Sequence, residues 1–524
     1  MTRYRLFLYL LLLSLPWLEP VPATQEGADL WRVLTPGISY REFYLPAPNH
    51  VYVARMDRSE PNVTLDSSIG QGKLSGELET VRGMAERYDQ AINYWEESWG
   101  GRNQVVVAIN GYFFDTESGV PWSGQLQSGW YAKRFDDRQN KSGFVWTMDR
   151  VAFVGGCVVH PPGKQVITHI PTGGTILFDG INVPRENDQL IVYTPQYDAT
   201  TPAADEGYEA LVELERPLMI LPSPAMNIGV VRQINDGQGS TQIPFDHIVL
   251  SASGKAAEAL RGSLSIGDQI GVSQEIRHLD STCSTPSPQS WTKAYAAIGA
   301  SFNFLRDGVI QGSDDLGALL HNPRTAVVFN DRYIYFIVVD GRQPLHSLGM
   351  SSVDLALFAK LTLGATWGIA LDGGGSTTMV VNGDVVNRPN PEIAFQKDDR
   401  GIASSEDNPT SRTKAYLSPP AQILNTIERV VANGLMMIVV QPKEQSTRFA
   451  PGTRVMISGG DQVSVRLGPG TNSAPLAYLP QNSQGTLLDH PLDGVFAKDF
   501  YWWKVDFGDL TGWVAEDFLS LAVP

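Results

Sequence analysis

The sequence predicts an α+β protein with a mixed β-sheet core, few helices and a small all-β barrel at the C-terminus. The chain has 524 residues, of which 50 are glycine and 34 are proline, a composition that favours turns and strands over long helices. Short apolar runs separated by Gly, Pro and Asn recur along it, and only two segments have good helical periodicity. Hydrophobic residues make up 42%, which excludes global disorder, and the length indicates more than one domain.

The two predicted helices cover residues 80–95 and 353–363. The first has a single apolar stripe formed by Val81, Met84, Ala85, Tyr88 and Ile92. The second has Leu355, Leu357, Phe358 and Leu361, followed by Gly364 where a helix is expected to stop.

The predicted strands are short apolar runs that end in turn residues. They lie at 51–54, 105–109, 151–154, 189–193, 210–214, 269–272, 325–329, 333–339, 367–371 and 377–381. The polar stretch 441–452, which contains two prolines, is predicted to be a linker to a separate β unit at 453–524.

The N-terminus has the pattern of a secretory signal peptide. Arg3 and Arg5 precede the apolar run 6–15, and small residues place the expected cleavage after Ala23. The alternative is a membrane anchor, but the run is shorter than the ~20 apolar residues that span a bilayer. We therefore expect a secreted or cell-envelope protein, with residues 24–48 as a lead-in and no transmembrane segment in the mature chain.

Net charge, cysteines and histidines limit the possible binding partners, disulfides and cofactors. The formal net charge is −16, which argues against nucleic acid or an anionic membrane as the main partner. The cysteines are Cys157 and Cys283, and the sequence leaves open whether they form a disulfide or remain free thiols. The histidines are scattered without zinc-ligand spacing, so no cofactor is required, and a divalent cation is left open.

Polar residues that are candidates for catalysis or ligand binding are concentrated between 322 and 389, at the ends of predicted strands. The cluster comprises the segments Asn322-Pro323-Arg324-Thr325, Asp340-Gly341-Arg342, Asp372-Gly373-Gly374-Gly375-Ser376-Thr377-Thr378 and Asn387-Arg388-Pro389. The glycines allow close approach of a ligand to backbone N–H groups, and the arginines suit a phosphate or carboxylate. The two aspartates match the carboxylate pair of glycosyl chemistry. The alternative is that each Asp-Gly only closes a turn and that Arg324 makes a structural ion pair.

These segments, together with Ala108-Ile109-Asn110-Gly111-Tyr112-Phe113, resemble the phosphodiester glycosidase family in order and spacing over roughly residues 49–440. The resemblance implies an α+β fold and hydrolysis of a sugar-1-phosphodiester. It implies Asp340, Asp372 and Asn110 as catalytic residues. The implied substrate-binding residues are Arg324, Arg342, Gly373, Gly374, Gly375, Ser376, Thr377 and Arg388.

The C-terminal region resembles bacterial SH3-like domains. Val463-Ser464-Val465-Arg466-Leu467-Gly468-Pro469, Trp502-Trp503-Lys504-Val505 and Thr511-Gly512-Trp513-Val514 carry that resemblance, with Ser464 or its neighbour in place of the usual Asn. Such domains often bind cell-wall peptides or glycans, although the module could be a passive spacer.

The sequence thus predicts an exported hydrolase of a sugar-1-phosphodiester. Two alternatives remain, a glycan- or cell-wall-binding protein without activity and a metal-assisted phosphodiesterase that cleaves P–O. The sugar, the aglycone, the roles of the two aspartates and the oligomeric state are not determined by the sequence.

Overall fold

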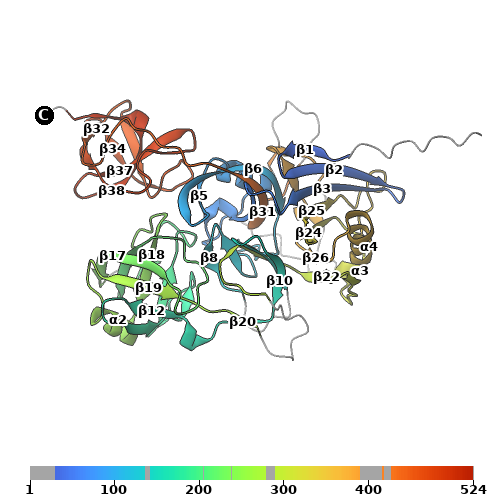
Figure 1. The fold of residues 1–524 in the computed structure, drawn as a ribbon, viewed down its shortest axis with the longest axis horizontal. Coiled ribbons are helices and arrows are strands. Elements are labelled where there is room, and N and C mark those ends of the chain that lie inside the picture. The colour runs from blue at the N-terminus through green and yellow to red at the C-terminus, as the bar shows by residue number, and fades with distance from the viewer. Residues whose placement is uncertain are drawn as a thin grey trace, which may run out of the picture.

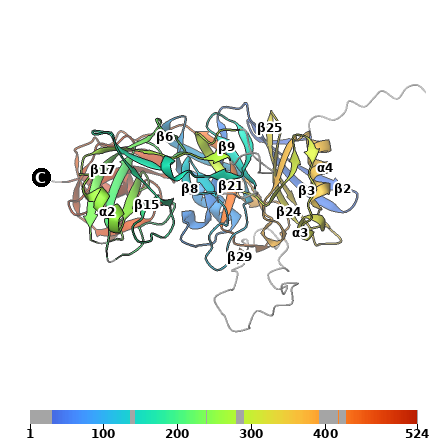
Figure 2. The ribbon, with the colours of Figure 1, turned by 90° about the horizontal axis from the view of Figure 1, so that it is seen from below.

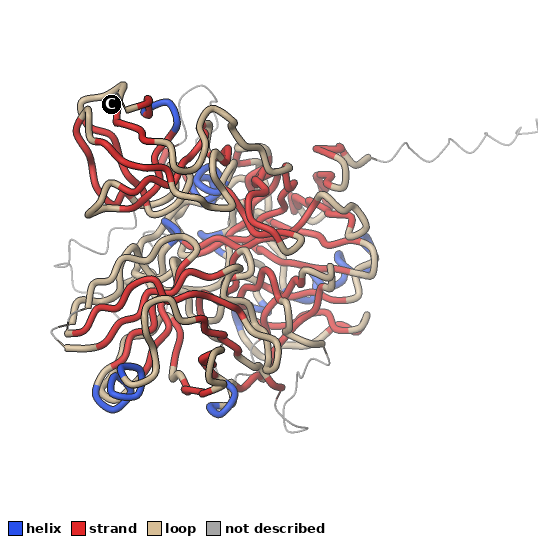
Figure 3. The backbone as a smooth tube through the Cα atoms, turned by 60° about the vertical axis from the view of Figure 1, so that its left-hand side comes forward, coloured by secondary structure: helices blue, strands red, loops and turns tan. Residues whose placement is uncertain are grey.

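The computed structural model describes residues 30–135, 142–204, 206–237, 239–278, 289–389, 416–417 and 427–522. The predicted signal peptide and Cys283 lie outside these ranges. The described part is mostly β-structure with a few short helices, in agreement with the predicted fold class (Figure 3). Its α-helices are α1 (Val81–Tyr88), α2 (Gly254–Arg261), α3 (Leu316–Leu319) and α4 (Ser352–Leu363).

The first sheet contains the strands that lead into the candidate site. In spatial order it consists of β1 (Arg32–Thr35), β2 (Ile38–Leu45), β3 (Asn49–Asp57), β25 (Tyr333–Val339), β24 (Arg324–Phe329), β26 (Trp367–Ala370), β22 (Phe302–Arg306) and β23 (Val309–Ile310). The predicted lead-in is therefore wrong as a separate segment, because residues 32–45 extend this sheet as β1 and β2.

Two further sheets face the first one. The second sheet consists of β28 (Asp384–Val385), β27 (Met379–Val381), β6 (Ser98–Asn110), β31 (Asn433–Gln441) and β4 (Val63–Ile69), with β5 (Ile92–Trp95) paired to β6. The third consists of β10 (Ala152–Gly156), β9 (Ser142–Thr147), β21 (Ala294–Gly299), β7 (Gln125–Gln127) and β8 (Trp130–Lys133).

Burial on both faces explains the continuous apolar sequence of β25. Ile334, Phe336 and Val338 contribute to the core between the first sheet and the other two. Tyr335 and Ile337 point the other way and pack with α4, which covers the outer face of the first sheet (Figures 1 and 2). A strand buried on both faces has no need of polar alternation.

The predicted helix at 80–95 is shorter in the structure. α1 ends at Tyr88, Gln90 has a positive φ of 55°, and residues 92–95 form β5 against β6. Ile92, Tyr94 and Trp95 have β-forming side chains, and pairing with a strand that follows in the chain outweighs the helical periodicity. α4 matches its prediction, with a Ser351–Asp354 capping box and Gly364 in the left-handed conformation at its end.

Residues 158–278 form a large sheet beside this core. Its strands, in spatial order, are β13 (Gly174–Leu177), β12 (Val166–His169), β19 (Gln269–Ser273), β17 (Asn227–Asp236), β16 (Tyr208–Leu214), β18 (His247–Ala252), β15 (Leu190–Tyr193) and β14 (Gly180–Ile181). Two two-stranded ribbons complete the described part of the main body, β11 (Val158–Val159) with β20 (Arg277–His278) and β29 (Tyr416–Leu417) with β30 (Ile427–Glu428). Cys157 is disulfide-bonded.

The C-terminal barrel lies next to the 158–278 sheet (Figure 1). Its strands are β34 (Pro475–Pro480), β33 (Gln462–Arg466), β38 (Thr511–Ala515), β37 (Phe500–Asp506), β35 (Gln484–Leu487), β32 (Arg454–Ile457) and β39 (Leu519–Leu521), with β36 (Val495–Ala497) paired to β37. Trp502, Trp503 and Trp513 are buried. None of the helices in the described ranges is long and apolar enough to cross a membrane.

The predicted linker is bonded to the barrel instead of standing free. Ser446 N donates to Gly494 O at 2.8 Å, Glu444 O accepts from Phe496 N at 2.9 Å, and the ring of Phe449 packs on Trp503. The barrel also contacts the main body, since Lys504 Nζ lies 3.2 Å from Glu213 Oε1.

We therefore expect limited proteolysis of the folded protein to spare residues 441–452. The backbone there is held by hydrogen bonds, and a protease must first open it. Mass spectrometry of the products over time measures this. Early cleavage within 441–452, with release of an intact barrel, would contradict the expectation.

Candidate active site

The glycine-rich loop crosses from the first sheet to the second. It begins after β26, contains the short 3-10 turn Gly374–Ser376 and continues into β27. Asp372 N donates to Gly111 O at 3.0 Å, and Gly374 N donates to Pro323 O at 3.1 Å. Three of the segments singled out in the sequence are thus in direct backbone contact.

Asn110 joins these segments through its side chain. Its Nδ2 donates to Asp372 O at 2.7 Å, while Oδ1 accepts from Thr325 Oγ1 at 2.7 Å and from Thr378 N at 3.1 Å. The residue is fully buried. Its amide is occupied in supporting the loop, so the structure assigns Asn110 a positioning role in place of the predicted catalytic one.

Asp372 is a buried carboxyl group at the start of the loop. Burial raises the pKa of Asp372 to about 6, although a hydrogen bond from Ser376, the Arg429 charge and the Gly373 N–H all act to lower it. Arg429 Nη1 also lies 3.3 Å from Ser376 Oγ. A carboxyl group with such a pKa can exist in either protonation state near neutral pH.

The amide donors of the loop are mostly used within the backbone. Gly374 N bonds to Pro323 O, Ser376 N to Gly373 O and Thr377 N to Gly374 O. The prediction that these N–H groups bind an anion is therefore wrong for Gly374 and Ser376. The Thr377 hydroxyl is buried without a hydrogen-bond partner in the described part of the chain.

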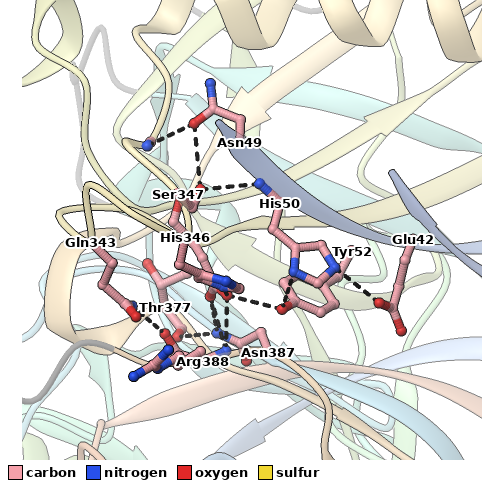
Figure 4. Close-up of polar contacts among 12 residues, drawn as sticks. Glu42, Asn49, His50, Tyr52, Gln343, His346, Ser347, Thr377, Asn387 and Arg388 are labelled. Carbon is pink, nitrogen blue, oxygen red and sulfur yellow. Dashed lines mark hydrogen bonds and ion pairs between the residues drawn. The ribbon is translucent and has the colours of Figure 1, made fainter. Parts of the chain in front are cut away.

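Asp340 follows β25 and is enclosed by hydrogen-bond donors, among them Tyr52, Asn387 and Arg388, which are labelled in Figure 4. Its carboxylate accepts from Tyr52 OH at 2.9 Å, Asn387 Nδ2 at 3.0 Å, Arg388 N at 3.0 and 3.1 Å, and it lies 2.8 Å from His346 Nε2. Asn387 Nδ2 also reaches Thr377 O at 3.1 Å. Through that amide, the Asp340 centre is joined to the loop that carries Asp372.

The three predicted arginines differ in their contacts. The Arg324 guanidinium donates to the carbonyl oxygens of Met350, Gly317, Ala318 and Leu320, at 2.6–3.2 Å. Burial and the charge of Arg342 lower the pKa of Arg324 to about 10. Its contacts anchor α3, so the structure assigns it a structural role instead of the predicted substrate contact.

Arg342 and Arg388 are exposed at the rim of the site. Arg342 Nε donates to Asn322 Oδ1 at 3.0 Å, and a Cβ added to Gly374 would lie 3.5 Å from Arg342 Nη1. Within the described part of the chain, the Arg388 guanidinium has no hydrogen-bond partner. Both arginines thus remain candidates for binding an anionic group.

Comparison with family models identifies two segments of the chain. Residues 227–405 match the model described as phosphodiester glycosidase, and residues 461–520 match the bacterial SH3 domain. The first match includes Asp340, Arg342 and Asp372, while Asn110 precedes it. Both predicted resemblances are confirmed.

Solved structures with a similar arrangement are distant. A hypothetical protein from Synechocystis is 15% identical, with a TM-score of 0.44, and the match covers 77% of this chain and 62% of that one. A Burkholderia pseudomallei protein described as exported is 19% identical, with a TM-score of 0.43 and coverage of 75% and 74%. The catalytic domain of zebrafish N-acetylglucosamine-1-phosphodiester alpha-N-acetylglucosaminidase, auto-inhibited by its pro-peptide, is 12% identical, with a TM-score of 0.34 and coverage of 80% and 85%. No curated protein matches the chain.

The candidate site contains residues that sequence reasoning missed. They are Glu42, His50, Tyr52, His346 and Arg429. Three of them come from β2 and β3, and Tyr52 is 288 residues from its partner Asp340. His346 had a usable signal, because it lies six residues beyond Asp340 in a polar loop.

Two groups of described side chains have the spacing of cation ligands. One is His50, Asp340 and His346, and the other is Glu213, Asp246 and His490. In the first group the Tyr52 hydroxyl lies 2.9 Å from both His50 Nδ1 and Asp340 Oδ2, and in the second Lys504 contacts Glu213. Because the Tyr52 hydroxyl and the Lys504 ammonium already contact the candidate ligand atoms, we assign a cation to neither group.

Proposed function

We propose that this protein is an exported hydrolase that cleaves a sugar-1-phosphodiester at the glycosyl C–O bond. The observation that carries the proposal is a pair of buried carboxyl groups of opposite character on adjoining loops. Asp372 has a pKa raised to about 6 by burial, whereas Asp340 is surrounded by hydrogen-bond donors that suit a carboxylate. Glycosidases pair a raised-pKa acid with a second group that activates water, and a buried carboxylate can be that group or orient it.

Asp372 is the proposed general acid. The leaving group is a phosphate monoester, whose second pKa is about 6. An acid of similar pKa can protonate the leaving oxygen without a large energetic mismatch. The exposed Arg342 and Arg388 would bind the phosphate oxygens, and the chain's acidic surface makes such local cations necessary.

Hydrolysis in ¹⁸O-labelled water tests the proposal. We expect the label in the sugar product, because water attacks the anomeric carbon. Label in the phosphate product would indicate P–O cleavage and favour a phosphodiesterase. Absence of turnover over a panel of sugar-1-phosphodiesters would favour a glycan-binding protein without activity. An Asp372→Asn variant serves as the background control.

Export and cell-wall binding belong to the same proposal. Support comes from the signal-peptide pattern at residues 1–23 and from the bacterial SH3 match at 461–520. N-terminal sequencing of the protein from its native envelope fraction should begin near Thr24. The full mature chain should co-sediment with purified cell wall. If the amount of protein in the supernatant is the same with and without cell wall, this part of the proposal is wrong.

Arg324 and Arg342 should respond differently to substitution by lysine. We expect Arg342→Lys to lower kcat/KM on a phosphodiester at least about tenfold, because lysine keeps the charge but loses the planar fork. Arg324→Lys should mainly lower thermal stability, since lysine cannot reach the same carbonyl oxygens of α3 and Met350.

A neutral aryl glycoside is the control substrate for this pair. Arg342→Lys should leave its hydrolysis nearly unchanged, whereas Arg324→Lys should affect charged and neutral substrates equally. Equal losses for Arg342→Lys on both substrates would make that residue structural and leave Arg388 as the phosphate contact.

A further inference from the structure

Five side chains form a continuous hydrogen-bonded array from β2 to the loop after β25 (Figure 4). His50 Nε2 lies 2.9 Å from Glu42 Oε2, and His50 Nδ1 lies 2.9 Å from the Tyr52 hydroxyl. Tyr52 donates to Asp340 Oδ2 at 2.9 Å, and His346 Nε2 lies 2.8 Å from the same oxygen. The array therefore passes through the carboxylate in the candidate site and ends at His346.

With Glu42 and Asp340 as carboxylates, the hydrogen bonds of the array require a proton on each ring nitrogen of His50. A carboxylate only accepts, so Glu42 requires a proton on His50 Nε2, and Asp340 takes the single hydroxyl proton of Tyr52. The Tyr52 oxygen must then receive a proton from His50 Nδ1. All contacts are satisfied when His50 carries protons on both nitrogens.

The surroundings of His50 support this count. The rings of Tyr44 and Tyr52 lie on it at centroid distances of 4.1 and 4.2 Å, a contact that favours a cation. Burial and the nearby Asp340 raise the pKa of Tyr52, so the phenol keeps its proton. Although burial opposes it, hydrogen bonds from His50, Tyr40 and Tyr44 lower the pKa of Glu42, so it remains a carboxylate.

The other end of the array determines the tautomer of His346. Its Nε2 lies 2.8 Å from Asp340 Oδ2, and because a carboxylate only accepts, Nε2 carries the proton and Nδ1 of the neutral ring has the lone pair. Nδ1 makes no hydrogen bond within the described ranges, and the His346 side chain is 28% exposed, whereas that of Asp340 is 0% exposed. Enzymes with a histidine base use this arrangement, in which a buried carboxylate orients a partly exposed imidazole.

We propose that His346 is the general base for the attacking water, and that Asp340, Tyr52, His50 and Glu42 are positioning residues that fix its tautomer. The inference rests on the proposed function. A water proton passes to His346 Nδ1 while the water oxygen bonds to the anomeric carbon. The C–O bond to phosphate breaks, its electron pair stays on the phosphate oxygen, and that oxygen takes the Asp372 proton. The proton on His346 then passes to solvent, and Asp372 takes a proton from solvent.

Kinetics of two variants and one control test the assignment. His346→Asn should lower kcat by about 10²–10⁴-fold with little change in KM, and should abolish the acid limb of the kcat/KM pH profile. Tyr52→Phe should lower kcat about tenfold and displace that limb, which a merely structural residue would not do. His169→Asn, at a His–Asp pair in the 158–278 sheet, is the matched control and should keep wild-type kinetics.

Nitrogen NMR of the resting enzyme at neutral pH tests the array without activity. We expect both His50 nitrogens to be protonated and His346 to be protonated on Nε2 alone. A singly protonated His50 would overturn the array, and an active His346→Asn variant with a wild-type pH profile would overturn the base. If the wild type hydrolyses no sugar-1-phosphodiester, the proposed function and the base assignment both fail. If the wild type is active and the His346→Asn variant keeps its activity and pH profile, only the base assignment fails.

Discussion

Replacement of Asp372 by asparagine is expected to lower kcat on a sugar-1-phosphodiester at least about a hundredfold. The amide is nearly isosteric but cannot donate a proton to the leaving phosphate oxygen, and general acid catalysis is worth about 10²–10⁴ in rate. Steady-state kinetics across pH measures the loss. In the wild type, kcat/KM should fall as pH rises through about 6, the pKa to which burial raises Asp372.

A glycosyl fluoride of the same sugar is the decisive control for the acid. Fluoride departs with little need of a proton, so Asp372→Asn should retain most of the wild-type rate on this substrate. A loss as large on the fluoride as on the phosphodiester would contradict the acid role. It would instead indicate that the Asp372 carboxylate acts directly on the sugar.

The same variant should be more stable than the wild type at alkaline pH. The pKa of folded Asp372 is raised above its ordinary value, so its contribution to stability is fully present below that ordinary value, near 3.9. It is lost as pH rises through about 6, because the charged form is penalised by burial. Asparagine removes that penalty, by roughly 1–3 kcal/mol at pH 8.

Thermal denaturation of both proteins at several pH values measures this difference. The gain in Tm of the variant should grow between about pH 4 and pH 8 and then level off. A constant difference over this range would mean that the Asp372 carboxyl group does not titrate near 6. Greater stability with lost turnover is the usual balance for a buried catalytic charge.

Local sequence patterns were sufficient for the strands that lead into the Asp340 and Asp372 loops. The apolar sequence of β25 and the glycine stop after α4 indicate their structures directly. Prediction failed where strand pairing outweighs a helical pattern in the sequence. Residues 92–95 have helical periodicity with α1, yet they form β5, because the aromatic residues there pair with β6.

The candidate site shows the same division. The Asp372 loop was predictable because glycines and an aspartate at the end of a strand are a local signal. The partners of Asp340 were not, since Tyr52 is 288 residues away and looks like any aromatic strand residue. Arg324 was misassigned because nothing in its own segment shows that its guanidinium meets the carbonyl oxygens of α3.

Gly374→Val is expected to lower kcat/KM at least about a hundredfold and to cost about 1–3 kcal/mol of folding stability. Gly374 has a φ of 61°, which a β-branched residue adopts only under strain. An added Cβ lies 3.5 Å from Arg342 Nη1, so the valine methyl groups extend into the space of that guanidinium. Activity and chemical denaturation of the purified variant measure the two effects.

Gly383→Val separates backbone strain from damage to the site. Gly383 has a φ of 85° in the turn between β27 and β28, and a Cβ there meets no atom within 4 Å. Its substitution should therefore cost a similar amount of stability while leaving turnover close to that of the wild type. If Gly374→Val and Gly383→Val lose activity equally, strain alone accounts for the effect. If Gly374→Val folds and retains near-normal turnover, the Gly374 loop does not approach the substrate, and the phosphate must be bound on the Arg388 side of Asp340.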